Sequence, residues 1–457
     1  MNLQVLKKTK KYALGVLFCF FIAAAHLHAQ EEDVYYSPDK IQLGINRAEE
    51  MLSKNDTEQA LEVLLYMFPY TEEDEQKTQI EFLIGLVSVA KQDFKSAEWV
   101  FRRILKNKPS LPRVRLELAM ALFSQKKYEK ADYHFRLVLG SKDLPPEVKQ
   151  KIMFFLAQIR YLRTWNLYLN LGITPTDNVN NVSGAETECI DFGGALLCRE
   201  LEKKRSSIGF SGYVGIENYL KITQGWRFKQ TVSGGLSDHA GKEFDSYVLS
   251  YSAGPLYNFK RGYAGVYAGA EKQWYGGEEL LHSFSALGDF GYDLSPRTSL
   301  GLYLNYKDNT FDRYEHMDGH ELFIMPSLYW GISSKSYILF KPSANFFRTQ
   351  MREHNKDSFK LAIGLGTELP LGISVYIEPS YTFAYNQGEN YFIENNGISY
   401  KKKEDESFTI SVRLLQRQID ILGFTPTLNY SYTDVTSNVK NQGYSKHTFE
   451  IGATKRF

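Results

Sequence analysis

The chain has 457 residues, which is enough for two domains. Its 54 Lys and Arg residues balance 53 Asp and Glu residues, so neither charge predominates and nothing favours a nucleic-acid-binding domain. Beyond the N-terminal segment there is no run of eighteen apolar residues, which excludes membrane-spanning helices there.

Residues 1–29 read as a secretory signal peptide. A positively charged start (Lys7, Lys8, Lys10, Lys11) precedes an apolar stretch from Tyr12 to Ala25. Leu27-His28-Ala29 is a plausible cleavage site, with Ala25 as an alternative, so we expect the mature chain to begin near Gln30. Cys19 follows the bulky Phe18, which does not suit lipoprotein processing.

Residues 30–160 are expected to form a tetratricopeptide-like helical domain. Three pairs of residues recur at a spacing of 34: Gly85 with Ala119, Ala97 with Ala131, and Phe101 with Phe135. This period and these residue types are typical of tetratricopeptide repeats. Helices near 41–54 and 57–67 fit an earlier repeat loosely, and a last helix is expected over 146–159. Such solenoids can serve as scaffolds, but their concave faces usually bind peptide or protein, which we favour.

Residues 164–457 show a different pattern, in which apolar and polar residues alternate. In the last segment His447, Phe449, Ile451, Ala453, Lys455 and Phe457 fall on one face. About fourteen such runs of roughly ten residues each are consistent with strands that cross a bilayer. The fold class predicted from these two segments is α + β, with the helical domain followed by a transmembrane antiparallel β-barrel of about 14 strands.

The connections between these runs separate a membrane barrel from a large soluble β-sandwich. Tight connections at 258–261, 293–297, 333–335 and 369–372 alternate with long polar ones at 174–205, 308–319, 386–405 and 434–445. Short turns on the periplasmic side and longer external loops are the outer-membrane pattern. The 31 Tyr and 30 Phe residues crowd the strand ends, where interfacial girdles lie. With the signal peptide, these features favour the membrane barrel.

Two cysteines, Cys189 and Cys198, lie in the longest polar loop. If the helical domain is periplasmic, this loop faces the cell exterior. In an oxidising compartment a disulfide is the default interpretation. The alternative, a metal site, would need more ligands than two thiols.

No catalytic, cofactor-binding or metal site is predicted. His316 and His320 lie in a predicted loop, and the only hints of a Ser-His pair are His282 beside Ser283 and His447 near Ser445. The inward strand faces do carry charge, which indicates a hydrated lumen. These residues are Arg227, Lys229, Lys307, Lys341, Lys360, Glu368, Glu378, Arg413 and Glu450.

In their order along the chain, these features resemble the surface lipoprotein assembly modifier (Slam) family. The most specific segments are Leu116–Ala119 with Tyr128–Leu139, Leu144–Pro146, Pro175–Asn180, Gly423–Pro426 and Lys455–Phe457. The resemblance implies an outer-membrane translocator of a Gram-negative bacterium that moves lipoproteins, or related secreted proteins, from the periplasm to the cell surface. It implies a periplasmic helical domain that assists client handling and a barrel that recognises the client, without catalytic residues.

The expected partners are a client surface lipoprotein, the lipid bilayer and the barrel assembly machinery, with a periplasmic chaperone as a further candidate. Phe449, Ile451 and Phe457 are expected to form the C-terminal signal for barrel assembly. No nucleic acid or cofactor is expected, and the protein is expected to be a monomer. Two other functions remain open: an exopolysaccharide export porin with a periplasmic tetratricopeptide domain, and a simple diffusion porin.

Overall fold

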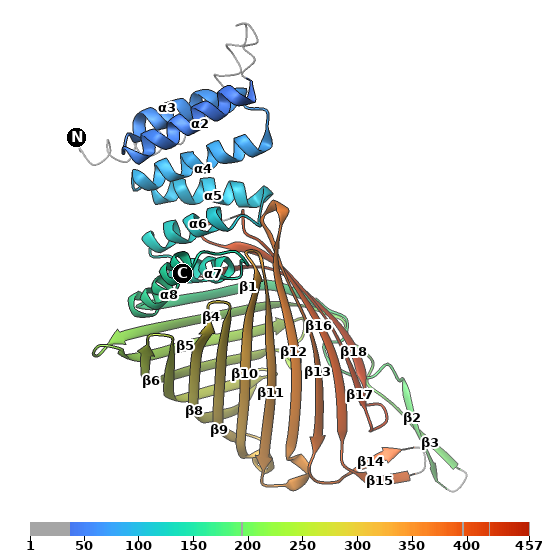
Figure 1. Cartoon of the computed structure of the whole chain (residues 1–457). Helices are drawn as coiled ribbons and strands as arrows, with labels where there is room; N and C mark the ends of the chain where they lie inside the picture. The colour runs from blue at the N-terminus through green and yellow to red at the C-terminus, as the bar shows by residue number, and fades with distance from the viewer. Residues whose placement is uncertain (1–36, 193–194, 395–396, 420, 457) are drawn as a thin grey trace, which may run out of the picture. The chain divides into compact units, whose positions relative to one another are not determined.

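The computed structural model describes residues 37–192, 195–394, 397–419 and 421–456 (Figure 1). The predicted signal peptide, with its cleavage site at Ala29, and the terminal Phe457 lie outside the described residues. Within them, seven α-helices precede a closed barrel of fourteen antiparallel strands, which confirms the predicted fold class. The chain divides into two compact units at Leu83 and Ile84, and each is described by itself.

The first unit contains α2 (Pro38–Ser53), α3 (Thr57–Met67), the short helix η1 (Phe68–Tyr70) and the first part of α4 (Asp74–Ala90). Ile41 and Ile45 of α2 and Leu64 of α3 are fully buried, so the two helices share an apolar core. The side chain of Asp56 accepts a hydrogen bond from the backbone N–H of Gln59 at 3.3 Å and caps α3. The loosely matching first repeat is therefore a capped helix pair.

The second unit begins with the rest of α4, followed by α5 (Phe94–Asn107), α6 (Pro112–Ser124), α7 (Tyr128–Leu139) and α8 (Pro146–Leu162). A Cβ atom added to Gly85 would lie only 2.4 Å from the ring of Phe101, so a larger residue would push α4 away from α5. The other small and aromatic repeat residues are also at helix contacts. Ala97, Phe101, Ala119, Ala131 and Phe135 all have 0% exposure.

The barrel strands are joined in chain order except where two hairpins interrupt the connections. The strands are β1 (Trp165–Thr176), β4 (Ser207–Lys221), β5 (Trp226–His239), β6 (Ser246–Phe259), β7 (Gly262–Tyr275), β8 (Glu278–Ser295), β9 (Thr298–Phe311), β10 (Gly319–Ser333), β11 (Ser336–Thr349), β12 (Lys356–Leu369), β13 (Ile373–Asn386), β16 (Glu404–Gln416), β17 (Thr425–Ser437) and β18 (Tyr444–Arg456). β1 pairs with both β4 and β18 and so closes the ring. The strands contain 12 to 18 residues, more than the ten expected.

The outer face of the barrel is apolar, and the exposure of the side chains alternates sharply from one residue to the next along a strand. On β12, Leu361, Ile363 and Leu365 are 46%, 46% and 43% exposed, whereas Ala362 between them is 2% exposed. On β18, Phe449 and Ile451 are likewise exposed on the outer face. A continuous band of exposed aliphatic and aromatic side chains is the surface that hydrocarbon covers in a membrane barrel.

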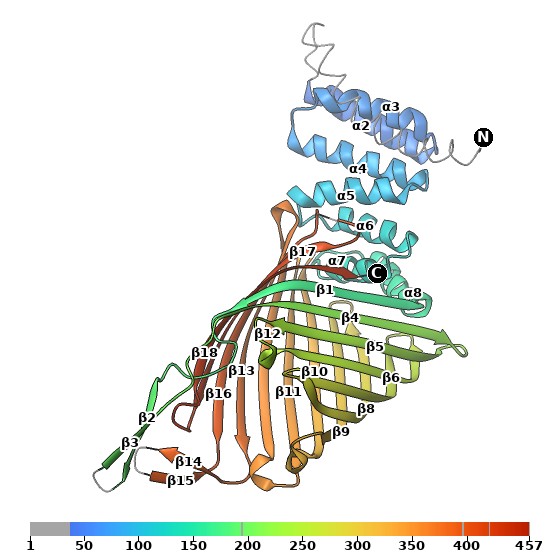
Figure 2. The ribbon, with the colours of Figure 1, turned by 180° about the vertical axis from the view of Figure 1, so that it is seen from behind.

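Most connections are shorter at one end of the barrel than at the other; the exceptions are the two-residue β7–β8 connection at 276–277 and the eight-residue β16–β17 connection at 417–424. At the end where α8 leads into β1, the strands are joined by six connections, at 222–225, 260–261, 296–297, 334–335, 370–372 and 417–424. The opposite end carries the hairpins β2–β3 (Thr187–Phe192, Ala195–Glu200) and β14–β15 (Asn390–Glu394, Gly397–Lys401), which lie next to each other in both views (Figures 1 and 2). Both hairpins lie in segments that were predicted from the sequence to be long polar loops. Among the helices in the described ranges, none is long and apolar enough to span a membrane.

Candidate functional site

The lumen of the barrel is lined by charged side chains that bond to each other across strands. Lys229 on β5 lies 3.0 Å from Glu217 on β4 and 3.6 Å from Asp289 on β8. Because β5 and β8 are not neighbours in the sheet, the contact with Asp289 runs through the interior. The lumen is therefore polar, with its charges balanced by partners inside it.

Two further lysine–carboxylate pairs in the lumen also skip a strand, whereas Glu450 bonds to the two strands next to its own. Lys307 on β9 lies 2.8 Å from Glu271 on β7, and Lys341 on β11 lies 2.6 Å from Glu378 on β13. Glu450 on β18 accepts hydrogen bonds from Asn429 at 2.9 Å and from Asn170 at 3.2 Å. Such a wet, charge-balanced interior suits passage of polar polypeptide, because no single charge offers a strong trap.

The helices α5–α8 and their linkers make contacts at all six short connections of the barrel. The bonds join Arg227 to the carbonyl of Arg163, Arg160 to the carbonyl of Lys260 (2.9 Å), Arg297 to the carbonyl of Ser141, Ser334 to the carbonyl of Ser110 (2.8 Å), Arg115 to Glu368 (2.6 Å) and Gln418 to the carbonyl of Arg102 (3.0 Å). Since these connections follow one another around a closed ring, the helices lie across this mouth of the barrel. We call this arrangement the covered mouth.

One ion-pair cluster of the covered mouth is centred on Asp293, near the end of β8. Its carboxylate lies 3.2 Å from Arg136 of α7 and 3.1 Å from Arg160 of α8. Burial alone would lower the pKa of Arg136, but Asp132 and Asp293 raise it above its ordinary value. Asp293 thus holds two helices to one strand end.

A second cluster is centred on Arg115 of α6, whose side chain is fully buried. Its guanidinium contacts Glu368 near the end of β12 at 2.6 Å, the carbonyl of Pro109 at 2.5 Å and Nδ1 of His134 at 3.2 Å. Because an arginine can only donate, Nδ1 of His134 accepts and the ring is neutral. Burial, followed by the charges of Arg115, Arg102 and Arg417, holds the pKa of His134 well below its usual value.

Close backbone packing completes the covered mouth. A Cβ atom added to Gly140, the residue after α7, would lie 2.5 Å from the carbonyl oxygen of Ser333 at the end of β10. A Cβ added to Gly331 would lie 3.1 Å from the Cα atom of Gly140. Only glycine allows the end of α7 to approach the strand this closely.

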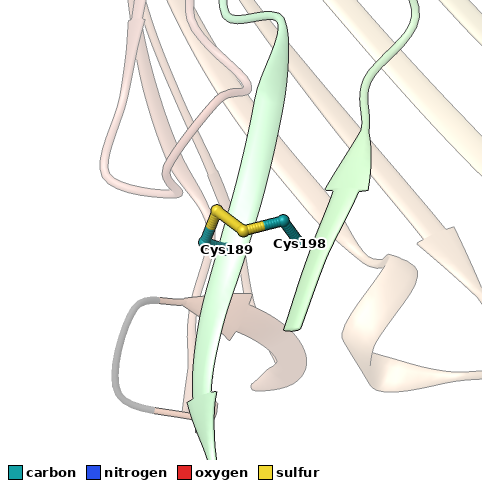
Figure 3. The surroundings of a disulfide bond; sticks show 2 residues. All are labelled: Cys189 and Cys198. Carbon is teal, nitrogen blue, oxygen red and sulfur yellow. A yellow bond between two sulfur atoms is a disulfide. The ribbon is translucent and has the colours of Figure 1, made fainter. Parts of the chain in front are cut away.

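At the opposite end of the barrel, Cys189 on β2 and Cys198 on β3 are directly opposed and joined by a disulfide with an S–S distance of 2.07 Å (Figure 3). Beside it on β2, Glu188 is buried and forms a salt bridge with Arg199 at 2.5 Å. The disulfide and the salt bridge fix the hairpin that interrupts the first long connection.

The residues predicted as sites fall into three separate places. The tetratricopeptide packing residues Gly85, Ala97, Phe101, Ala119, Ala131 and Phe135 lie inside the helical stack, the cysteines lie in the β2–β3 hairpin, and Phe449 and Ile451 lie on the outer barrel face. Sequence patterns did not indicate a role for Arg115, His134, Arg136, Asp293 or Arg417, and they predicted Glu368 only as a residue of the lumen. Arg115 could have been noticed in the sequence, because it is a charged residue among the buried positions of an otherwise apolar helix face.

The serine and histidine residues singled out in the sequence form hydrogen bonds within the barrel. Ser283 donates to Asn309 at 2.7 Å, and Nδ1 of His447 lies 3.0 Å from the hydroxyl of Tyr430. Over the part of the chain that the structure describes, there is no group of three His, Cys, Asp or Glu side chains that could hold a metal ion.

Comparison with known families identifies this architecture. A family profile described as "Surface lipoprotein assembly modifier" matches residues 165–457, and one described as "Surface lipoprotein assembly modifier, N-terminal TPR repeats" matches residues 27–135. The chain belongs to the surface lipoprotein assembly modifier family. The barrel of this Slam protein therefore lies in the outer membrane of a Gram-negative bacterium, and the family consists of transporters rather than enzymes.

Individual relatives are distant but cover most of the Slam chain. The "Surface lipoprotein assembly modifier" of Pasteurella multocida is 21% identical over 88% of this chain and 81% of its own length. The "Hemophilin secretion modulator" of Acinetobacter baumannii is 22% identical over 82% of this chain and 78% of its own length. Among solved structures, a mutant of the TodX monoaromatic hydrocarbon channel aligns with a TM-score of 0.38 and 11% identity, over 64% of this chain and 90% of its own.

Proposed function

We propose that this Slam protein is an outer-membrane translocator that moves lipoproteins from the periplasm to the cell surface. The observation that carries the proposal is the covered mouth: the helices α5–α8 and the segments that join them form bonds at or next to all six connections at this end of a polar, closed barrel. A simple diffusion porin does not need helices across its entrance. A protein that receives a polypeptide and passes it through the barrel does need a domain at the entrance that can bind the polypeptide.

The proposed path begins at the helices and continues through the lumen. A periplasmic client held by the helices has a high effective concentration at the barrel entrance, which raises occupancy without any covalent chemistry. The paired charges Lys229 with Asp289, and Lys307 with Glu271, present a hydrated wall to the passing chain. Folding of the client outside the cell then makes passage irreversible.

Passage through the covered mouth requires some of its contacts to open. The hydrogen bond from Ser334 to the carbonyl of Ser110 is one such contact. A disulfide introduced with the Ser110→Cys/Ser334→Cys pair would hold this contact closed. Export that stops on oxidation and resumes on reduction would support opening during transport, whereas unchanged export would argue that the client passes beside closed helices.

The remaining assignments are part of the same proposal. Residues 1–29 would direct export, residues 30–160 would form the periplasmic domain and residues 164–457 the barrel. Phe449, Ile451 and Phe457 would be read by the barrel assembly machinery, and the outward positions of Phe449 and Ile451 support this because exposed side chains are accessible to it. The protein would act as a monomer, with a periplasmic chaperone delivering the client.

The experiment that tests the function compares intact cells with and without this gene. Proteins removed by an external protease are identified by mass spectrometry in the parent, the deletion strain and the complemented strain. Loss of one or a few exposed lipoproteins, which remain inside the cell, supports the translocator. Unchanged lipoproteins together with loss of a matrix polysaccharide would instead indicate an exopolysaccharide exporter.

A further inference from the structure

The seam between β1 and β18, where the barrel closes, is paired less completely than the other seams. β1 is in register with β4 from Trp165 to Thr176 without a gap. With β18 it is in register only from Tyr168 to Ile173 and again at Thr176. Over the part of the barrel that the structure describes, no other two neighbouring strands have so few positions in register. The backbone ladder is therefore weakest at this seam.

The local sequence accounts for the short pairing. Pro175 has no backbone N–H to donate to β18, and the register is interrupted at Thr174 and Pro175. Gly172 lies directly opposite Gly452, so no two side chains pack across the seam at this position. Because pairs of side chains across strands stabilise a sheet, the seam is weak in packing as well as in its backbone ladder.

Side chains fasten the same seam at the end opposite the covered mouth. Oγ1 of Thr176 donates to the carbonyl of His447 at 3.0 Å, and the carboxylate of Asp177 accepts from the backbone N–H of His447 at 2.7 Å. Nδ2 of Asn178, a fully buried residue, donates to the carbonyl of Ser445 at 3.0 Å. We call these five residues the outer clasp. The clasp closes one end of a seam whose middle is held weakly.

The two faces of the seam border different surroundings. On the outer face Leu171 and Ile451 are 42% and 64% exposed, at the surface that hydrocarbon covers. On the inner face Asn170 donates to Glu450 at 3.2 Å, but Glu450 also accepts from Asn429 of β17 at 2.9 Å. Glu450 therefore keeps a partner when β1 and β18 separate. An opening here would connect the polar lumen directly with the bilayer.

We propose that the β1–β18 seam parts within the membrane and admits the lipid-bearing end of the exported lipoprotein, an inference that rests on the proposed function. The acyl chains of a lipoprotein favour hydrocarbon, whereas its polypeptide suits the polar lumen. Both parts can occupy their own surroundings during export only if the barrel wall opens between two strands. The polypeptide then travels in the lumen while the acyl chains stay in the bilayer, and the short segment between them lies in the open seam.

The free-energy cost of opening selects this seam over the others. An unpaired backbone N–H or carbonyl group is costly in hydrocarbon, so the seam with the fewest positions in register opens with the smallest loss. The exposed edges of β1 and β18 can pair with the extended backbone of the client segment, as sheet edges do with added strands. The outer clasp keeps the strands in register beyond the opening and lets the seam close again after passage.

Cross-linking the seam tests this proposal on the full-length protein in intact cells. Leu171 lies opposite Ala453 on β18 and opposite Gly212 on β4. The seam variant is Leu171→Cys/Ala453→Cys. The control, Leu171→Cys/Gly212→Cys, shares the first cysteine but joins β1 to its other neighbour. Both are compared after oxidation and after reduction. Loss of thiol labelling reports the cross-link, and heat-modifiable migration shows that the barrel is folded.

We expect surface display of the acylated client to fall at least tenfold in the oxidised seam variant and to recover on reduction. In the oxidised control it should change less than twofold, because β1 and β4 stay paired throughout export. Undiminished display in the oxidised seam variant would overturn the proposal. Equal losses in the two variants would also overturn it, because export would then need a flexible barrel wall rather than this seam.

A client without acyl chains separates the lipid path from the polypeptide path. Its acylated cysteine is replaced by serine, and its signal peptide by that of a soluble secreted protein. Release of this client into the medium should be the same in the oxidised seam variant and the oxidised control. A tenfold block in the seam variant alone would overturn the assignment of the seam to the lipid-bearing end. If deletion of the gene leaves lipoprotein display unchanged, the proposed function itself fails, whatever the cross-links do.

Discussion

The guanidinium of Arg115 on α6 lies 2.6 Å from the carboxylate of Glu368 on β12, and the two side chains are 0% and 10% exposed. This buried pair joins the helical stack to the barrel at the β12–β13 connection. A buried charge that loses its partner still bears the free-energy cost of leaving water. Removing one member of the pair should therefore destabilise the covered mouth.

Replacing Glu368 with Gln should loosen α6 from the barrel. It leaves Arg115 buried without a carboxylate, which costs about 3 kcal/mol. Hydrogen exchange of α6 in the full chain should accelerate while the barrel strands stay protected. The double variant Arg115→Met/Glu368→Gln should recover part of the lost stability, because it also removes the unpaired charge of Arg115.

The exposed pair Lys54–Glu50, at 2.5 Å, provides the control for that experiment. Glu50→Gln should leave the exchange rates of α2 almost unchanged, because solvent screens the exposed pair. Similar exchange rates for α6 in the Glu368→Gln variant and the unmodified chain would show that the buried pair does not hold the helix.

Replacing Gly140 with Val should separate the end of α7 from β10. Even a Cβ atom would come within 2.5 Å of the carbonyl oxygen of Ser333, and that atom belongs to the backbone and cannot rotate away. We expect protease cleavage between α7 and α8 to increase at least fivefold. Gly184→Val is the matched control, since its Cβ would meet only the end of Lys204 at 3.7 Å. Equal cleavage of the two variants would contradict the close approach.

Acidification should weaken the packing around His134. The pKa of this residue is lowered in the folded state, so below about pH 6.5 the unfolded chain binds a proton that the folded chain refuses. Stability from this group is full above that pH and is lost as the pH falls, by at most about 1.4 kcal/mol per unit. Hydrogen exchange of α7 between pH 7.5 and 5.5, corrected for intrinsic rates, measures it. His134→Gln should have a smaller pH dependence, and an unchanged dependence would exclude His134 as its source.

Removing the disulfide should loosen one external hairpin without affecting the barrel. In the chain-entropy model, closing the loop between Cys189 and Cys198 is worth about 2–3 kcal/mol. The Cys189→Ser/Cys198→Ser variant should therefore be cut faster by an external protease near β2 and β3, while its heat-modifiable migration stays that of a folded barrel. Loss of the folded barrel would mean that the disulfide is needed for barrel formation.

The sequence predicted the repeating parts of this fold better than its contacts. The alternation along β12 and β18 follows directly from lipid on one side and water on the other, and the spacing of Gly85 and Ala119 follows from the packing of repeated helix pairs. The strands are longer than expected because several extend into connections that look like polar loops. The β2–β3 and β14–β15 hairpins escaped notice because they are short and lie inside those loops.

The covered mouth could not be predicted for a different reason. Arg115 lies on the helix α6 and Glu368 on the strand β12, far apart in the sequence, and nothing in either segment indicates the other as its partner. A charge on the buried face of α6 indicates that a partner exists, but pairing it requires the three-dimensional arrangement.

The most direct measurement of the central claim is the amount of surface-exposed lipoprotein on intact cells, determined by protease shaving and mass spectrometry with and without this gene. The account predicts that one or a few lipoproteins disappear from the surface in the deletion strain, accumulate inside, and return on complementation. An unchanged set of exposed lipoproteins in the deletion strain would contradict it.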